Sequence, residues 1–118
     1  MSVISPMRPV DLVHLARYTG GDRTIDTEVL TLFTGQAEQL IARLRIQLDR
    51  ADAQGWHETT HALKGAAGCI GAFALADAAA AAEVLDPASQ GEEAGRAVDG
   101  LRSLITRVKL FLHSHFKN

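Results

Sequence analysis

The chain has 118 residues, of which 47% are hydrophobic and 22% charged, so it can bury one core but is of ordinary size for a single domain. Its formal net charge of -2 offers no basic field that would attract nucleic acid or an anionic membrane. The one cysteine, Cys69, excludes an intrachain disulfide, and no segment has the apolar length of a signal peptide or a membrane-spanning helix. We therefore expect a single cytoplasmic domain over residues 1–118 that binds neither nucleic acid nor membrane.

The predicted elements are all helical, because apolar residues recur every three or four positions and no alternating run indicates a β-strand. The first element is a short helix at about residues 12–19, which Asp11 can cap and which Gly20 and Gly21 can end. Four longer helices are expected after it, at about residues 24–50, 53–70, 72–86 and 92–115.

Three residues mark boundaries among the longer helices. Asp52 is a residue of the N-cap type, Gly71 can adopt the left-handed conformation that stops a helix, and Pro87 closes the helix before it. The expected apolar stripes comprise Val29, Phe33, Leu40, Leu44 and Leu48 in the first long helix, and Val98, Leu101, Ile105, Val108 and Leu112 in the last. Together these features predict an all-α fold, an antiparallel up-down-up-down four-helix bundle with a short N-terminal capping helix.

The segment HETTHALKG, residues 57–65, contains two overlapping motifs that both need His61. His57, Glu58 and His61 form HExxH, the helical signature of zinc proteases. His61 also begins HxLKG, which places a lysine and a glycine just after the histidine. The two motifs imply different chemistry, so the predicted function depends on which of them the surrounding residues support.

A helical layout at about 100° per residue separates two faces of this segment. The apolar face carries Trp56, Leu63, Ala67 and Ile70, with Thr59 and Ala66 beside them. The residues within about 60° of His61 are His57, Glu58, Lys64, Gly65 and Gly68. His61 is therefore expected to point to solvent.

Two glycines lie beyond His61 on its own face, and each costs about 1 kcal/mol relative to alanine inside a helix. A bare helix surface at Gly65 and Gly68 would let a second protein bring a bulky reactive group to the imidazole. Lys64 can reach the same space and pair with negative charge placed on His61. Because a neutral imidazole has a free nitrogen lone pair, it can accept a phosphoryl group in an in-line displacement. This face therefore favours phosphoryl transfer.

The residues around His61 resemble those of the histidine-containing phosphotransfer (Hpt) domain of multistep two-component signalling. The resemblance covers roughly the whole chain from Val10 onward. It rests on the residues from His61 to Ala67, then Ile70-Gly71-Ala72, Leu75 and Ala82-Glu83, with further similarity at Leu30 to Phe33, in the leucines of the second helix and at Asp52.

The resemblance implies that His61 is the phosphoacceptor, which takes the group from an aspartyl phosphate on one receiver domain and returns it to another. Lys64 would stabilise the phosphate charge, and Gly65 and Gly68 would give the partner access. The expected partners are response-regulator receiver domains and a hybrid histidine kinase. Family members have no nucleotide site and no autokinase activity, so the resemblance implies a phosphotransfer intermediate rather than an autonomous enzyme. We also expect a monomer without a cofactor of its own, and Mg²⁺ only on the receiver domain. The chain agrees in having neither a Walker loop nor a kinase-like glycine loop.

Two positions depart from the family or lie outside its motif. Ala82 stands where family members often have leucine, which concerns local packing rather than chemistry. His57 is not part of the motif and has no assigned role, and we interpret it as a solvated side chain.

Two other functions stay open. A zinc hydrolase would use His57, Glu58 and His61, but the extended HExxHxxGxxH form fails at Lys64 and Ala67, and only Glu83 is a candidate third ligand. The alternative is a helical interaction module that binds a partner without phosphorylation. Leu32 and Ile46 lie off the apolar stripe of their helix and would either extend a docking surface or pack under other segments. Lone Cys69 is expected to be a small packed residue.

Overall fold

The computed structural model of the protein describes residues 8–116. The ends of the expected 1–118 domain, residues 1–7 and 117–118, lie outside this range. The helices are α1 (Leu12–Thr19), α2 (Arg23–Asp49), α3 (Ala53–Cys69), α4 (Phe73–Glu83) and α5 (Gly91–Phe116). No helix in the described range combines the length and the apolar composition that crossing a membrane would require.

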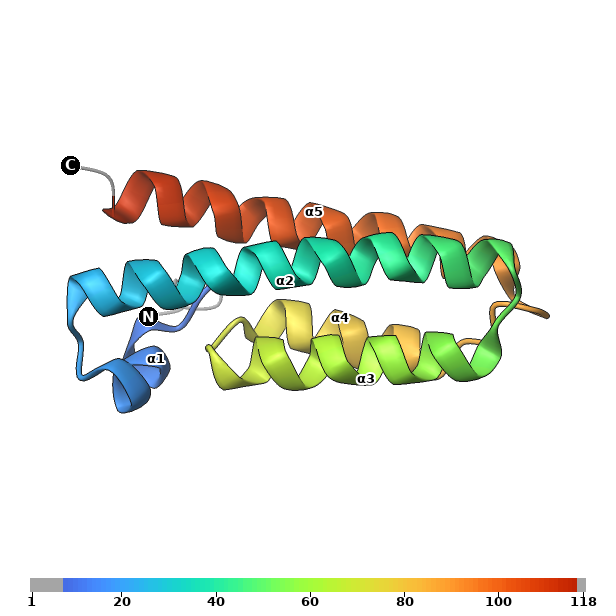
Figure 1. The fold of residues 1–118 in the computed structure, drawn as a ribbon, viewed down its shortest axis with the longest axis horizontal. Helices are drawn as coiled ribbons and strands as arrows, with labels where there is room; N and C mark the ends of the chain where they lie inside the picture. The colour runs from blue at the N-terminus through green and yellow to red at the C-terminus, as the bar shows by residue number, and fades with distance from the viewer. Residues whose placement is uncertain (1–7, 117–118) are drawn as a thin grey trace, which may run out of the picture.

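The four longer helices form an antiparallel bundle (Figure 1). Each of them packs on the one that follows it in the chain, and α5 returns to pack on α2, which closes the ring. The hairpin of α3 and α4 lies along one side of the long pair α2 and α5, and α1 covers one end, beside the α3–α4 turn. The predicted fold class is therefore confirmed.

The short helix α1 is held against the α3–α4 turn by its N-cap residue, Asp11. The side chain of Asp11 accepts from the backbone of Val13 and His14, while its own backbone N–H donates to the carbonyl of Gly71 at 2.9 Å. Gly71 has a φ of 84°, and a Cβ there would lie 2.8 Å from the Asp11 carbonyl oxygen. Only glycine fits this approach without strain. The predicted helix stop at Gly71 is therefore also the position where the N-terminus of α1 contacts the α3–α4 turn.

Burial confirms the predicted stripe of α5 more fully than that of α2. In α5, Val98, Leu101, Ile105 and Val108 are buried and Leu112 is partly buried. In α2, Phe33 and Leu44 are buried, but Val29, Leu40 and Leu48 are only partly so, and the buried face also comprises Leu30, Ala37 and Ile41. The reason is that α2 packs against both α3 and α5, so two adjacent rows of its surface face the core.

The predicted end of α4 is wrong. We expected a helix at 72–86 closed by Pro87, whereas α4 ends at Glu83. The carbonyl of Ala82 accepts from the indole Nε1–H of Trp56 at 2.8 Å and from the backbone N–H of Leu85 at 3.1 Å, which tightens the last turn. The chain then leaves the helix before Pro87, because the residue preceding a proline disfavours helical backbone.

The other helix ends differ from prediction by one residue at most, and Asp52 is the N-cap of α3 as expected. Cys69, in contrast, is exposed, so its predicted packing is wrong. It ends α3 on the side away from the buried Ala67. The off-stripe residues Leu32 and Ile46 are also exposed, so no segment within residues 8–116 covers them.

Candidate functional site

The two predicted faces of α3 are confirmed by burial. Trp56 and Leu63 are fully buried, whereas the side chains of His57 and His61 are 64% and 66% exposed. Gly65 is exposed as well. His61 therefore stands on an open surface of the bundle, where a second protein can reach its ring.

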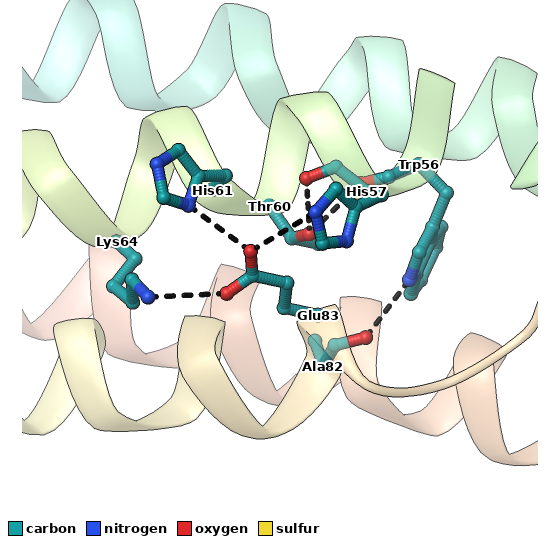
Figure 2. Close-up of polar contacts among 7 residues, drawn as sticks. All are labelled: Trp56, His57, Thr60, His61, Lys64, Ala82 and Glu83. Carbon is teal, nitrogen blue, oxygen red and sulfur yellow. Dashed lines mark hydrogen bonds and ion pairs between the residues drawn. The ribbon is translucent and has the colours of Figure 1, made fainter. Parts of the chain in front are cut away.

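Glu83, the last residue of α4, lies at the centre of the polar residues on this face (Figure 2). Its Oε2 atom is 3.0 Å from Nδ1 of His61 and 3.5 Å from Nε2 of His57. Its Oε1 atom is 3.2 Å from Nζ of Lys64. One carboxylate from α4 thus connects three basic side chains of α3.

The Glu83 carboxylate is held in its ionised form although its side chain is only 12% exposed. The hydrogen bond from Lys64 lowers the pKa of Glu83 below its ordinary value of 4.5, and His61 adds to the effect. Partial burial opposes it by raising the pKa, because it removes water from the charged form. At neutral pH the site therefore contains a fixed negative charge directly beside the imidazole of His61.

The position of Glu83 depends on the residue before it. Trp56, fully buried in α3, donates its indole N–H to the carbonyl of Ala82 and so fixes the register between the two helices. Thr60, also fully buried, donates its hydroxyl to the backbone carbonyl of Trp56 at 2.8 Å. The bond from Trp56 holds Ala82 against α3, and Glu83, the next residue, faces the polar side chains of α3 (Figure 2).

The hydrogen bond to Glu83 sets the tautomer of His61. An ionised carboxylate can only accept, so the Nδ1 atom of His61 must carry the proton. In the neutral ring the lone pair is then on Nε2, which lies on the side of the ring away from Glu83 (Figure 2). The exposed nitrogen of His61 is therefore the nucleophilic one.

Gly65 and Gly68 are not required by packing within the bundle. A Cβ added at either position would meet no other atom within 4 Å. Since glycine also weakens a helix interior, the fold alone would favour another residue at both positions. Both glycines leave the helix surface beyond His61 without side chains.

Replacing Gly65 by leucine is expected to slow phosphoryl transfer to the chain by about 10- to 100-fold, because the side chain would hold an incoming donor away from the imidazole. The fold should be retained, with thermal stability equal to or above that of the wild type. The matched control is Gly35→Leu in α2, where a Cβ also meets open space. Equal transfer rates for the two variants would show that Gly65 is incidental.

The geometry does not favour a zinc site at the HExxH motif. Glu83 does lie beside both histidines, but the ammonium of Lys64 is bound to its other oxygen and would repel a dication. The carboxylate of Glu58 accepts from the side-chain amide of Gln54 at 3.3 Å. Among residues 8–116, no group of three or more histidine, cysteine or acidic side chains is arranged to hold a metal ion.

Comparison with known proteins decides between the motifs. The sequence profile of the Hpt domain matches residues 28–110, which include all of α3 and α4 and most of α2 and α5. The chain belongs to the Hpt domain family. Hpt domains are the histidine phosphotransfer modules of phosphorelays, and they relay phosphoryl groups with receiver domains of two-component systems.

The Hpt fold is also found in a solved structure, that of histidine-containing phosphotransfer protein B (HptB) from Pseudomonas aeruginosa PAO1. The two structures superpose with a TM-score of 0.81 over 98% of this chain and 97% of that one, at 20% sequence identity. No curated protein matches the chain. The structural likeness therefore supports the Hpt fold, and the sequence profile supports the family.

Sequence reasoning selected His61, Lys64, Gly65 and Gly68 for this Hpt domain, and the structure brings them together on one face of α3. Sequence reasoning did not predict the contact of Glu83 with His61. It includes Glu83 in the family pattern, as part of Ala82-Glu83, and otherwise considers it only as a zinc ligand. Its contact with His61, 22 residues earlier in the chain, depends on how α3 and α4 are aligned.

Proposed function

We propose that His61 is the phosphoacceptor of this Hpt domain and that Glu83 orients it. The observation that carries the proposal is the 3.0 Å hydrogen bond between Nδ1 of His61 and Oε2 of Glu83. It fixes the proton on Nδ1 and leaves the Nε2 lone pair facing solvent. The exposed helix surface at Gly65 supports the same assignment, because it gives a receiver domain room to approach.

The transfer step follows from this tautomer. The Nε2 lone pair of His61 forms the N–P bond as the P–O bond to the donor aspartate breaks, and the electron pair of that bond stays on the aspartate oxygen. Nδ1 keeps its proton, so the imidazole becomes cationic. Glu83, already ionised, lies against that nitrogen and offsets the new charge. Return of the group to a second aspartate reverses these changes.

We assign Lys64 to the phosphoryl group once it has arrived. In the unphosphorylated protein its ammonium is paired with Glu83 at 3.2 Å, on a side chain that is 38% exposed. A phosphoryl group on Nε2 brings additional negative charge, and the flexible lysine stem can turn toward it. Lys64 would then exchange one anionic partner for another.

The variant Lys64→Ala is expected to remain an acceptor but to be phosphorylated about tenfold more slowly, or to lose its phosphohistidine correspondingly faster, for a loss of about 1.4 kcal/mol. The measurement is a time course of phosphohistidine formation and decay. Lys109→Ala is the control, because Lys109 pairs with Glu38 on another face at 2.7 Å. An unchanged rate and lifetime in Lys64→Ala would exclude the assigned role.

We further propose that both the donor and the recipient are response-regulator receiver domains, one of them carried by a hybrid histidine kinase. Mg²⁺ would be bound by the receiver domain, while this chain works as a monomer with no cofactor and no kinase activity of its own. The family and the exposed acceptor face support the receiver partners. The cytoplasmic location expected from the sequence stays a prediction.

The function is tested by mixing the chain with purified receiver domains that have been phosphorylated at their aspartate. We expect the phosphoryl group of the receiver domain to move to the chain. The phosphate on the chain should be acid-labile and alkali-stable, as an N-linked phosphate is. Profiling all receiver domains of the same cell would identify the partners. Binding to a receiver without any transfer of phosphate would instead support the alternative, an interaction module.

A further inference from the structure

His57 shares the acceptor oxygen that orients His61. It lies one helical turn before His61, and its Nε2 atom is 3.5 Å from the same Oε2 of Glu83. The two imidazole rings are nearly parallel, with an interplanar angle of 16° and centroids 6.3 Å apart. The sequence-based interpretation of His57 as merely solvated therefore leaves out a specific contact.

His57 is the partner of this oxygen, besides His61 itself, whose charge depends on protonation. Lys64 pairs with the other oxygen of Glu83, and the basic partners of Glu83 within residues 8–116 all come from α3. The group facing His57 from α4 is Glu83 itself, and on its own helix the adjacent Glu58 is bonded to Gln54. A neutral His57 can donate only a weak hydrogen bond to Oε2, whereas a protonated His57 forms an ion pair with it.

We propose that His57 is a positioning residue that sets, according to pH, how strongly Glu83 holds the Nδ1–H of His61. The inference rests on the proposed function, because it concerns the rate at which His61 accepts phosphate. It adds to that function a proton-linked control that the HxLKG motif does not contain. Unlike His61, His57 does not touch the reacting atoms and acts through Glu83.

The direction of the effect follows from charge. When His57 is neutral, Glu83 is available to orient His61 and to offset the positive charge that its ring gains on phosphorylation. When His57 is protonated, it draws Glu83 to itself and places a second positive charge beside that ring. Acceptance of phosphate should therefore fall as the pH falls, and more steeply than protonation of His61 alone would cause.

The test compares wild type with His57→Gln, because the glutamine amide can donate to Glu83 but cannot become charged. Between about pH 8 and about pH 6, the wild-type transfer rate should fall about two- to fivefold more than the rate of His57→Gln, as expected for an exposed ion pair. The control His113→Gln removes a titratable histidine from α5 and should keep the wild-type profile. Superimposable profiles for wild type and His57→Gln would overturn the inference.

A second measurement needs no phosphate donor. Nitrogen NMR should show the ring signals of His61 responding to the titration of His57 in the wild type, and this response should vanish in Glu83→Gln. A His61 titration that is identical in wild type and His57→Gln would overturn the inference even if receiver domains phosphorylate the chain. Coupling seen by NMR without transfer from any receiver would instead overturn the proposed function, and with it the role of His57 in transfer.

Discussion

Replacement of His61 by alanine is expected to abolish phosphorylation of the chain by every receiver domain that phosphorylates the wild type. The reason is that His61 begins the HxLKG motif and has Lys64 and the bare surface at Gly65 one turn further along α3, whereas His57 lies outside the motif. The His61 side chain is 66% exposed, so its removal should leave the bundle intact. The measurement is transfer of the phosphoryl group from a phosphorylated receiver domain, with circular dichroism to confirm that the variant is folded.

The informative comparison for this result is His57→Ala. That variant retains the acceptor and should still become phosphorylated, although with an altered dependence on pH. A zinc hydrolase built on HExxH would need both histidines and would lose its activity in either variant. Phosphohistidine that persists in His61→Ala would contradict the assignment and move the search for the acceptor to the other histidines.

Replacement of Trp56 by alanine is expected to lower the free energy of unfolding by about 3–5 kcal/mol. Trp56 of α3 is fully buried and bonded to α4, so its removal leaves a cavity and loses the hydrogen bond to Ala82. Trp56→Phe keeps most of the packing and should cost about 1–3 kcal/mol. Urea denaturation followed by circular dichroism measures both, since the variants lack the one tryptophan that fluorescence would report.

Two further observations would check this prediction. Leu32→Ala removes a side chain that is 65% exposed and should change stability by less than about 0.5 kcal/mol. Trp56→Phe should also slow phosphoryl transfer, because Glu83 follows directly after the carbonyl that the indole holds. A loss of less than about 1 kcal/mol in Trp56→Ala would show that the α3–α4 contact is secured elsewhere.

The parts of the fold that could be predicted are those determined within a single helix. The cap at Asp11, the stripe of α5 and the exposure of His61 each follow from the order of residues along one element. The stripe of α2 was only partly right, because its buried surface depends on which two neighbours the helix has. The sequence of one helix does not contain that information.

The parts that could not be predicted depend on contacts between helices. α4 ends at Glu83, ahead of the predicted stop at Pro87, directly after the Ala82 carbonyl that accepts from Trp56, 26 residues earlier in the chain. The partnership of Glu83 with His61 and His57 depends on the same alignment of α3 with α4. A sequence-based layout of α3 could place the acceptor and its glycines on one face, but it could not show which carboxylate would lie opposite.

The openness of the face around His61 also determines the order of events in a relay. With His61 as the proposed acceptor, one imidazole nitrogen on one side of one helix would serve both the protein that delivers phosphate and the protein that removes it. The two would then take turns, and each would have to dissociate before the other could dock. An excess of unphosphorylated recipient would delay loading by the donor, and the flow of phosphate would depend on the relative abundance of the two partners.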